Sequence, residues 1–317
     1  MMDWKACAAL FPGQGSQVVG MGADFARRFP LARQTFEQAD DILGYSLSKI
    51  CWNGPSEELD QTAVTQPALY VCSLVIWRVL KDLLPSAKPA WLAGHSLGEF
   101  SALAAAEAFG FAAGLRLVEA RGRYMQMAGE RNPGAMAAIL ALEIAQVESL
   151  CAAVSAESGK IVVLANDNCP GQAVVSGDSD AVDELIKRAA AAGARRAVKL
   201  AVSVAAHSPL MDSASDGFRE VLARASFSPP NAPVVGNVTA QPLVNAADIV
   251  TELDQQLTQS VRWTDSMRAM IDAGAETFIE IGAGNVLSGL IRRIDRSKRR
   301  ISLNSVEALE AFLESQA

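Results

Sequence analysis

The chain has 317 residues, of which 50% are hydrophobic and 20% charged, with a formal net charge of −7. This composition predicts a well-filled globular core rather than disorder, and the acidic balance argues against a nucleic-acid partner, which needs a basic surface. The five cysteines form no Cys-x-x-Cys pair, so neither a disulfide framework nor a zinc site is expected. There is no signal-peptide pattern and no run of 18 apolar residues, so we expect a soluble, cytoplasmic protein with no membrane partner.

Short apolar strands alternate with helical stretches over most of the chain. In chain order, a strand is predicted at 6–11, and a second at 90–93 runs directly into a turn and a helix from about 97 to 107. Further strands are predicted at 233–238 and 277–282. This alternation is typical of a parallel α/β sheet.

The middle of the chain follows another order: strand, helix, strand, strand, helix, strand. The predicted ranges are 134–140, 143–156, 160–167, 172–178, 180–193 and 195–202. That order is typical of a ferredoxin-like unit, and GERNPG (129–134) is predicted to be its entry linker. We therefore expect a small ferredoxin-like domain, residues 130–200, inserted into a large α/β domain of residues 1–129 and 201–317.

Ser96 lies between two glycines in GHSLG (94–98), which matches Gly-x-Ser-x-Gly. A strand, this motif and then a helix is the arrangement of a nucleophile elbow, in which the glycines permit a tight turn and the helix start offers N–H groups to an oxyanion. The alternative is that Ser96 only caps the helix.

A serine nucleophile needs a base, and the chain has only two histidines. His95 is adjacent to Ser96, and neighbours at that spacing rarely face each other. His207 is predicted at a strand-to-helix turn, with Ser208 as an N-cap and Pro209 as the first helical residue. The alternative for His207 is a purely structural role in a loop.

Arg121 falls in the middle of an apolar helix face when 115–128 is wound at 100° per residue. A buried arginine is costly unless an anion meets it. That anion is either an internal Asp or Glu, or a bound carboxylate, which a guanidinium holds in a bidentate way.

With these three residues in place, the chain resembles the malonyl-CoA:acyl-carrier-protein transacylases of fatty-acid synthesis and the related acyltransferase domains of polyketide synthases. The resemblance extends over nearly the whole chain and implies a large α/β-hydrolase-like domain with a short parallel sheet. The motifs that carry it are FPGQGSQ (11–17), TQPALY (65–70), GHSLGEFSAL (94–103), RGRYMQ (121–126), GAMAAI (134–139), NDNCPGQAVVSG (166–177), VAAHSPLM (204–211), QQLTQSVRW (255–263) and EIGAGNVLSGLI (280–291).

The resemblance implies ping-pong transfer of a malonyl group from malonyl-CoA to the phosphopantetheine thiol of an acyl carrier protein. Ser96 would carry the acyl ester, His207 would be the general base, and Arg121 would bind the free carboxylate of the malonyl group. No metal, nucleotide or flavin cofactor is implied, and a monomer is expected because the family is usually monomeric.

The family's remaining roles transfer by position. Gln14 and Leu97 would offer backbone N–H groups to the oxyanion. Gln256 matches the residue whose backbone carbonyl orients the histidine, and Asn168 lies where the small domain approaches the thioester arm. Leu97 also favours malonyl over methylmalonyl, although VAAH (204–207) matches neither form of the polyketide specificity motif.

A carrier protein is usually acidic, so a basic docking surface is expected. Arg195, Arg196 and Lys199 in RRAVK (195–199) are the predicted docking residues, whereas the basic run 292–300 is interpreted as a solvated face.

Three other functions make different demands on the sequence. A serine esterase would have an acidic triad member between its serine and a histidine nearer the C-terminus. A hydrolase that strips stalled acyl groups from carrier proteins usually lacks the arginine. A non-catalytic scaffold would not need Ser96, His207 and Arg121 together.

Overall fold

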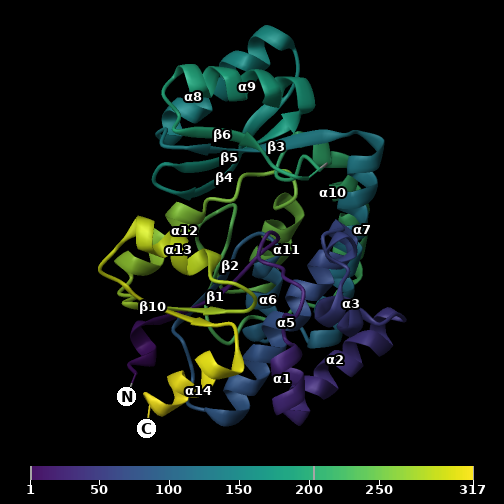
Figure 1. Ribbon diagram of the computed structural model, residues 1–317, viewed down its shortest axis with the longest axis vertical. Helices are drawn as coiled ribbons and strands as arrows, with labels where there is room; N and C mark the ends of the chain where they lie inside the picture. Colours follow the sequence, from purple (N-terminus) through teal and green to yellow (C-terminus); the bar gives the residue numbers. More distant parts are fainter. Residues whose placement is uncertain (1, 203, 317) are drawn as a thin grey trace.

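The computed structural model describes residues 2–202 and 204–316, which build two β-sheets stacked along the long axis (Figure 1). The larger sheet has six strands in the order β10-β9-β1-β2-β7-β8, and all its pairings are parallel except that of β7 with β8. Its strands are β1 (Cys7–Phe11), β2 (Trp91–Gly94), β7 (Val234–Val235), β8 (Pro242–Leu243), β9 (Thr277–Ile281) and β10 (Arg299–Leu303).

The predicted α/β fold with a parallel sheet is confirmed. Strands β1 and β9 are buried along their whole length, as expected for parallel strands covered on both faces; β1 (CAALF) is wholly apolar, whereas β9 (TFIEI) includes the buried Glu280. Strands β8 and β10 were not predicted. Both lie at the edges of the sheet, where β10 (RRISL) is only partly buried and carries charged residues.

Helices pack around the large sheet, and the longest of them is a core helix. The helices of this part are α1 (Ala23–Arg28), α2 (Pro30–Leu43), α3 (Leu47–Asn53), α4 (Ser56–Leu59), α5 (Thr62–Leu83), α6 (Gly98–Ala105), α7 (Phe111–Arg131), α10 (Asp212–Arg224), α11 (Ala246–Gln255), α12 (Trp263–Asp272), α13 (Val286–Ile294) and α14 (Val306–Glu314). Helix α5 is long and apolar enough to cross a membrane, with a mean hydropathy of 1.4, but 78% of that segment is buried inside the protein against α7 and other helices. Its apolar character therefore serves the core.

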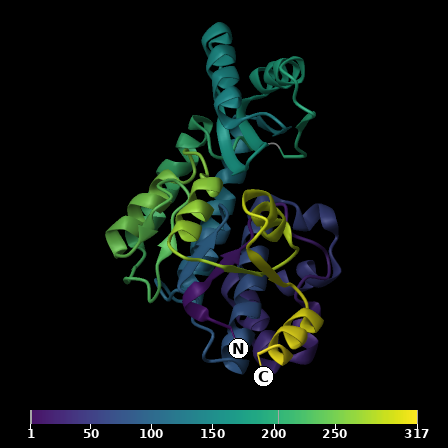
Figure 2. The ribbon, with the colours of Figure 1, turned by 90° about the vertical axis from the view of Figure 1, so that its left-hand side faces the viewer.

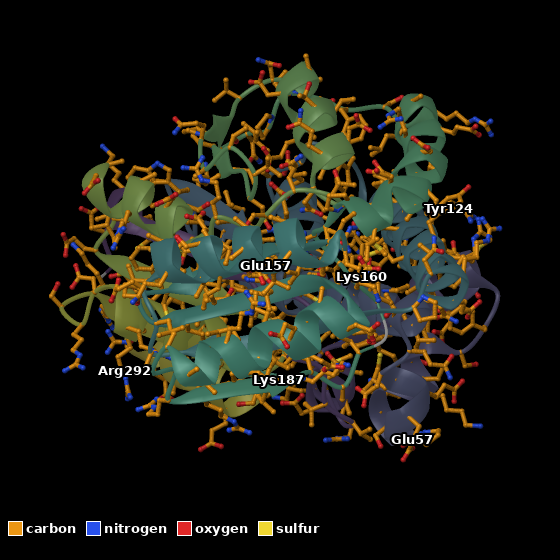
Figure 3. The ribbon with its side chains drawn as sticks, turned by 90° about the horizontal axis from the view of Figure 1, so that it is seen from above. Glu57, Tyr124, Glu157, Lys160, Lys187 and Arg292 are labelled. Carbon is orange, nitrogen blue, oxygen red and sulfur yellow. The ribbon has the colours of Figure 1, made fainter. Side chains whose placement is uncertain are left out.

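The smaller sheet is antiparallel, with the strand order β4-β5-β3-β6. Its elements are β3 (Gly134–Leu140), α8 (Ile144–Ser158), β4 (Val162–Cys169), β5 (Gln172–Asp178), α9 (Ser179–Ala191) and β6 (Arg196–Lys199). Helices α8 and α9 cover one face of the sheet, with Glu157 and Lys187 on their outer side (Figure 3). The termini lie together at the opposite end of the molecule (Figure 2).

Two predicted boundaries in this region are wrong. The linker expected at 129–134 is mostly helix, because α7 continues to Arg131 and leaves two residues before β3. The helix ends there because Pro133 disfavours the helical conformation at Asn132. The strand expected at 195–202 ends at Lys199, after which the chain leaves the sheet.

The turn after β2 is held against the end of β1 by two glycines. A Cβ on Gly98 would lie 2.0 Å from the Phe11 carbonyl oxygen, and one on Gly94 would lie 1.9 Å from the backbone of Gly98. Neither neighbour is the end of a flexible side chain, so the backbone itself would have to move.

We predict that Gly98→Ala lowers the free energy of unfolding by about 3 kcal/mol, the cost of overpacking a close backbone contact. The matched control is Gly289→Ala on α13, where a new Cβ would meet nothing within 4 Å and the change should stabilise by about 0.5–1 kcal/mol. Denaturant unfolding measures both. Equal stability of the two variants would contradict the close packing of the turn.

Candidate active site

Ser96 stands at the tip of the turn between β2 and α6 with a left-handed backbone, φ +51°. A non-glycine residue there is uncommon and is typical of a tight strand-to-helix turn that exposes its side chain. The Asn237 side chain holds the turn, because its Oδ1 accepts from the Ser96 N–H (2.6 Å) and its Nδ2 donates to the Gly94 carbonyl (2.7 Å). The capping interpretation of Ser96 is wrong, since α6 has Leu97 at its N-cap and no side-chain cap.

The Ser96 hydroxyl contacts both predicted partners. Its Oγ lies 2.8 Å from His207 Nε2 and accepts a hydrogen bond of 3.1 Å from Arg121 Nη2. His207 Nδ1 lies 2.8 Å from the backbone carbonyl oxygen of Gln256, which only accepts, so Nδ1 carries the proton. Nε2 is then a free acceptor, and the hydroxyl proton of Ser96 points at it.

His207 is buried and stays neutral. Burial, and after it the charge of Arg121, lowers the pKa of His207 to about 3. The expected position at a strand end is wrong: His207 lies in an irregular segment, with φ +59°, just before a 3-10 turn at Pro209–Met211 that leads into α10. Its N–H donates to the Leu257 carbonyl, which fixes the histidine beside Gln256.

Arg121 lies on the buried face of α7, and only 1% of it is exposed. Nη1 donates to Gln66 Oε1 (2.8 Å) and Nη2 donates to Gln256 Oε1 (2.9 Å), while Nε has no partner among the described residues. No Asp or Glu in residues 2–202 and 204–316 forms a direct salt bridge with Arg121. A buried guanidinium held by neutral amides keeps its charge available for an incoming carboxylate.

The two N–H groups assigned to an oxyanion border the same space. Gln14 follows β1 and Leu97 begins α6, and both line the cavity around Ser96. Over the described ranges, neither backbone N–H donates a hydrogen bond. Unpaired backbone N–H groups, such as that of Leu97 at the N-cap of α6 and that of Gln14 in the turn after β1, are suited to stabilise a developing negative charge.

The cavity around Ser96 has a volume of about 440 Å³ and lies between the two sheets. The large-sheet side contributes Ser96, Arg121 and His207, and the small sheet contributes Met136 and Asn168 among others. Asn168 Oδ1 lies 2.7 Å from Nε2 of His95, so it fixes the other histidine beside the cavity. A larger cavity of about 1150 Å³ borders the start of β2, away from these residues.

Three buried polar residues of the site were not predicted. Gln66 and Glu99 lie within motifs that were recognised, but no role was attached to them; both are at most 1% exposed. Asn237 falls within the strand predicted at 233–238, whereas β7 ends at Val235. Gly236 before the asparagine was the one available signal that the strand ends earlier than predicted.

The predicted docking residues differ in their surroundings. Arg195 and Arg196 are exposed at the edge strand of the small sheet. Lys199 is not a free cation, because its Nζ lies 3.0 Å from the Asp183 carboxylate. Both side chains of this pair are 40% or more exposed, so Lys199 stays on the surface and its docking role stays a prediction.

The glycine-containing stretch GAGNVL (282–287) precedes α13, where a helix N-terminus is a typical phosphate site. The Glu280 carboxylate already accepts from the N–H groups of Leu287 and Ser288 at the helix start. The helix N-terminus that a nucleotide phosphate would use is therefore occupied by a side chain.

Comparison with known proteins places this geometry in a family. The acyl transferase domain family matches residues 9–306. The malonyl CoA-acyl carrier protein transacylase of Haemophilus influenzae is 42% identical over 98% of this chain and 99% of its own. The structure of the same-named enzyme from Coxiella burnetii superposes with a TM-score of 0.94 at 40% identity, covering 98% of this chain and 97% of that one.

A further solved structure is that of a malonyl-transacylase in complex with a type II polyketide acyl-carrier protein. That enzyme is 42% identical, with a TM-score of 0.94, covering 98% of this chain and 100% of its own. By its domain, its full-length relatives and its structural neighbours, the chain belongs to the family of malonyl CoA-acyl carrier protein transacylases.

Proposed function

We propose that this protein transfers a malonyl group from malonyl-CoA to the phosphopantetheine thiol of an acyl carrier protein, for fatty-acid or polyketide synthesis, through a malonyl ester on Ser96. The observation that carries the proposal is the contact of one hydroxyl with both a neutral imidazole (2.8 Å) and a buried guanidinium (3.1 Å). A malonyl thioester has a carboxylate one methylene away from the carbonyl that reacts, so it needs an anion site this close to the nucleophile.

The first half-reaction begins when His207 Nε2 takes the hydroxyl proton of Ser96. Oγ forms a bond to the thioester carbonyl carbon, and the oxyanion rests on the N–H groups of Gln14 and Leu97, each such donor being worth about 3 kcal/mol. The carbon–sulfur bond then breaks, and the CoA thiolate takes the proton back from His207. The carrier-protein thiol reverses these steps and leaves with the malonyl group.

Gln256 takes the place of the acidic member of a serine–histidine triad. Its backbone carbonyl accepts from His207 Nδ1–H and holds the imidazole in the tautomer that is basic at Nε2. A serine esterase has no use for the guanidinium of Arg121, so that rival function leaves the most costly buried group of the site without a purpose.

We further divide the chain into a large α/β-hydrolase-like domain, residues 1–129 and 201–317, and a ferredoxin-like small domain, residues 130–200. The β-α-β-β-α-β chain order and the sheet order β4-β5-β3-β6 support this division.

The five buried free cysteines fit a reducing cytoplasm. The protein acts as a monomer, without metal, nucleotide or flavin.

We expect malonyl-CoA alone to leave a malonyl ester on Ser96, detected by peptide mass spectrometry. Arg121→Ala should lower the rate of this acylation about a hundredfold more for malonyl-CoA than for acetyl-CoA, because only malonyl carries the paired carboxylate. Acylation elsewhere would overturn the role of Ser96. Equal losses on both substrates would overturn that of Arg121.

The acylation rate should show no acid limb near pH 6.5. Because burial and Arg121 lower the pKa of His207 to about 3, the base stays unprotonated as pH falls from 8 to 5, whereas an ordinary histidine would lose activity over that range. Single-turnover acylation between pH 5 and 8, with circular dichroism to confirm folding, measures this. A midpoint near 6.5 would contradict it.

Charge reversal at Arg195 and Arg196 should raise the KM for acyl carrier protein about tenfold and leave acylation by malonyl-CoA unchanged, because these exposed residues contact only the acidic partner. Lys199→Glu serves as the matched control with a smaller effect, since Asp183 already balances its charge. An unchanged KM in the double variant would remove this patch as a docking surface.

A further inference from the structure

Glu99 is a fully buried carboxyl group close to the arginine, and the reaction described above does not use it. It lies in the first turn of α6, three residues after Ser96, and is 0% exposed. Its Oε1 accepts from the Asn237 N–H (3.1 Å), and its Oε2 accepts from Gln256 Nε2.

The direction of each hydrogen bond in this group is fixed by chemistry. Arg121 can only donate, so the Gln256 atom that faces it must be the amide oxygen. Gln256 Nε2 therefore points the other way and donates to the Ser96 carbonyl (3.0 Å) and to Glu99. The Asn237 backbone N–H is also a donor only, so both Glu99 oxygens face donors.

These donors favour the ionised form of Glu99. A protonated carboxyl would turn one O–H toward an N–H group and lose that bond. Burial, and secondly the charge of Glu252, raises the pKa of Glu99 well above its ordinary value, although the bonds from Gln256 and Asn237 and the charge of Arg121 lower it. The ionised form is therefore inferred from the geometry, in which both carboxyl oxygens face groups that can only donate. Glu252 and Arg121 are the charged side chains that act on it.

Arg121 in turn needs a counter-charge, and Glu99 supplies it indirectly. Burial lowers the pKa of Arg121 to about 10, and the charge of Glu99 opposes that change. A direct salt bridge would occupy the Nη groups that face Ser96. The Gln256 amide placed between the two charges takes one Nη2 hydrogen bond, so that Nη2 still donates to Ser96 Oγ and no carboxylate of the described residues neutralises the guanidinium directly.

We propose that Glu99 is a positioning residue: an ionised carboxylate that orients the Gln256 side-chain amide and, through it, holds the Arg121 guanidinium toward Ser96, so that the site selects acyl groups with a free carboxylate. This rests on the proposed function, because it assigns Arg121 to that carboxylate. Glutamine at 99 would break the relay, since its NH₂ must face either the Asn237 N–H or the Gln256 NH₂.

A double-mutant cycle tests the proposal, with the rate of Ser96 acylation by malonyl-CoA and by acetyl-CoA as readouts. We expect Glu99→Gln to lower the malonyl rate by about tenfold or more and the acetyl rate by less than about threefold. In an Arg121→Ala background the same change should alter the malonyl rate by less than about threefold, because the group through which it acts is gone.

The matched control is Glu252→Gln. Glu252 is buried nearby, but its carboxylate contacts Val238 and Thr239 rather than Gln256. This variant should leave the ratio of malonyl to acetyl rates unchanged even where it lowers the melting temperature. If Glu99→Gln does not fold, Glu99→Asp, which keeps the charge on a shorter arm, enters the same cycle with the same expected pattern.

Equal losses on both substrates, or a full tenfold loss in the Arg121→Ala background, would overturn the proposal and make Glu99 merely structural. Failure of the proposed function looks different. In that case Arg121→Ala alone would lower the acylation rates with malonyl-CoA and with acetyl-CoA equally, whatever residue occupies position 99.

Discussion

A single buried guanidinium sets the conditions for the rest of the site. Arg121 is fixed on α7 with almost no exposure, and the amides of Gln66 and Gln256 hold it while no carboxylate of the described chain touches it. Moving such a charge out of water costs several kcal/mol unless it is compensated. In the proposed function, the carboxylate of the bound malonyl group supplies that compensation in the cavity beside Ser96.

The fold brings together at Ser96 residues from several separate segments of the chain. The turn after β2 supplies Ser96, α7 supplies Arg121, and the segment after α11 supplies Gln256, whose carbonyl and side chain serve different partners. Asn237 fastens the Ser96 turn from a fourth segment. Parallel strands ending at one edge of a sheet make this convergence possible, because their connecting loops meet there.

Much of this was predictable from sequence, and the exceptions have physical reasons. Buried strands and amphipathic helices leave periodic patterns, so the parallel sheet and the position of Arg121 in an apolar face were predicted. Edge strand β10 was not predicted, because its charged and half-buried residues resemble a solvent-exposed segment. The sequence did not predict the roles of three side-chain amides, those of Gln66, Asn237 and Gln256. The hydrogen-bond partners of an amide are set by tertiary contacts, which no local sequence pattern encodes.

The imidazole rests on a main-chain oxygen rather than on a side chain, and this has a consequence for how the site varies. Every amino acid has a carbonyl, so replacing residue 256 never deletes the acceptor for His207 Nδ1. Only a shift of the backbone after α11 would do so. A substitution at position 256 therefore keeps the acceptor for His207 Nδ1 but changes the side-chain amide that contacts Arg121. The two contacts made by this residue can thus vary independently in related chains.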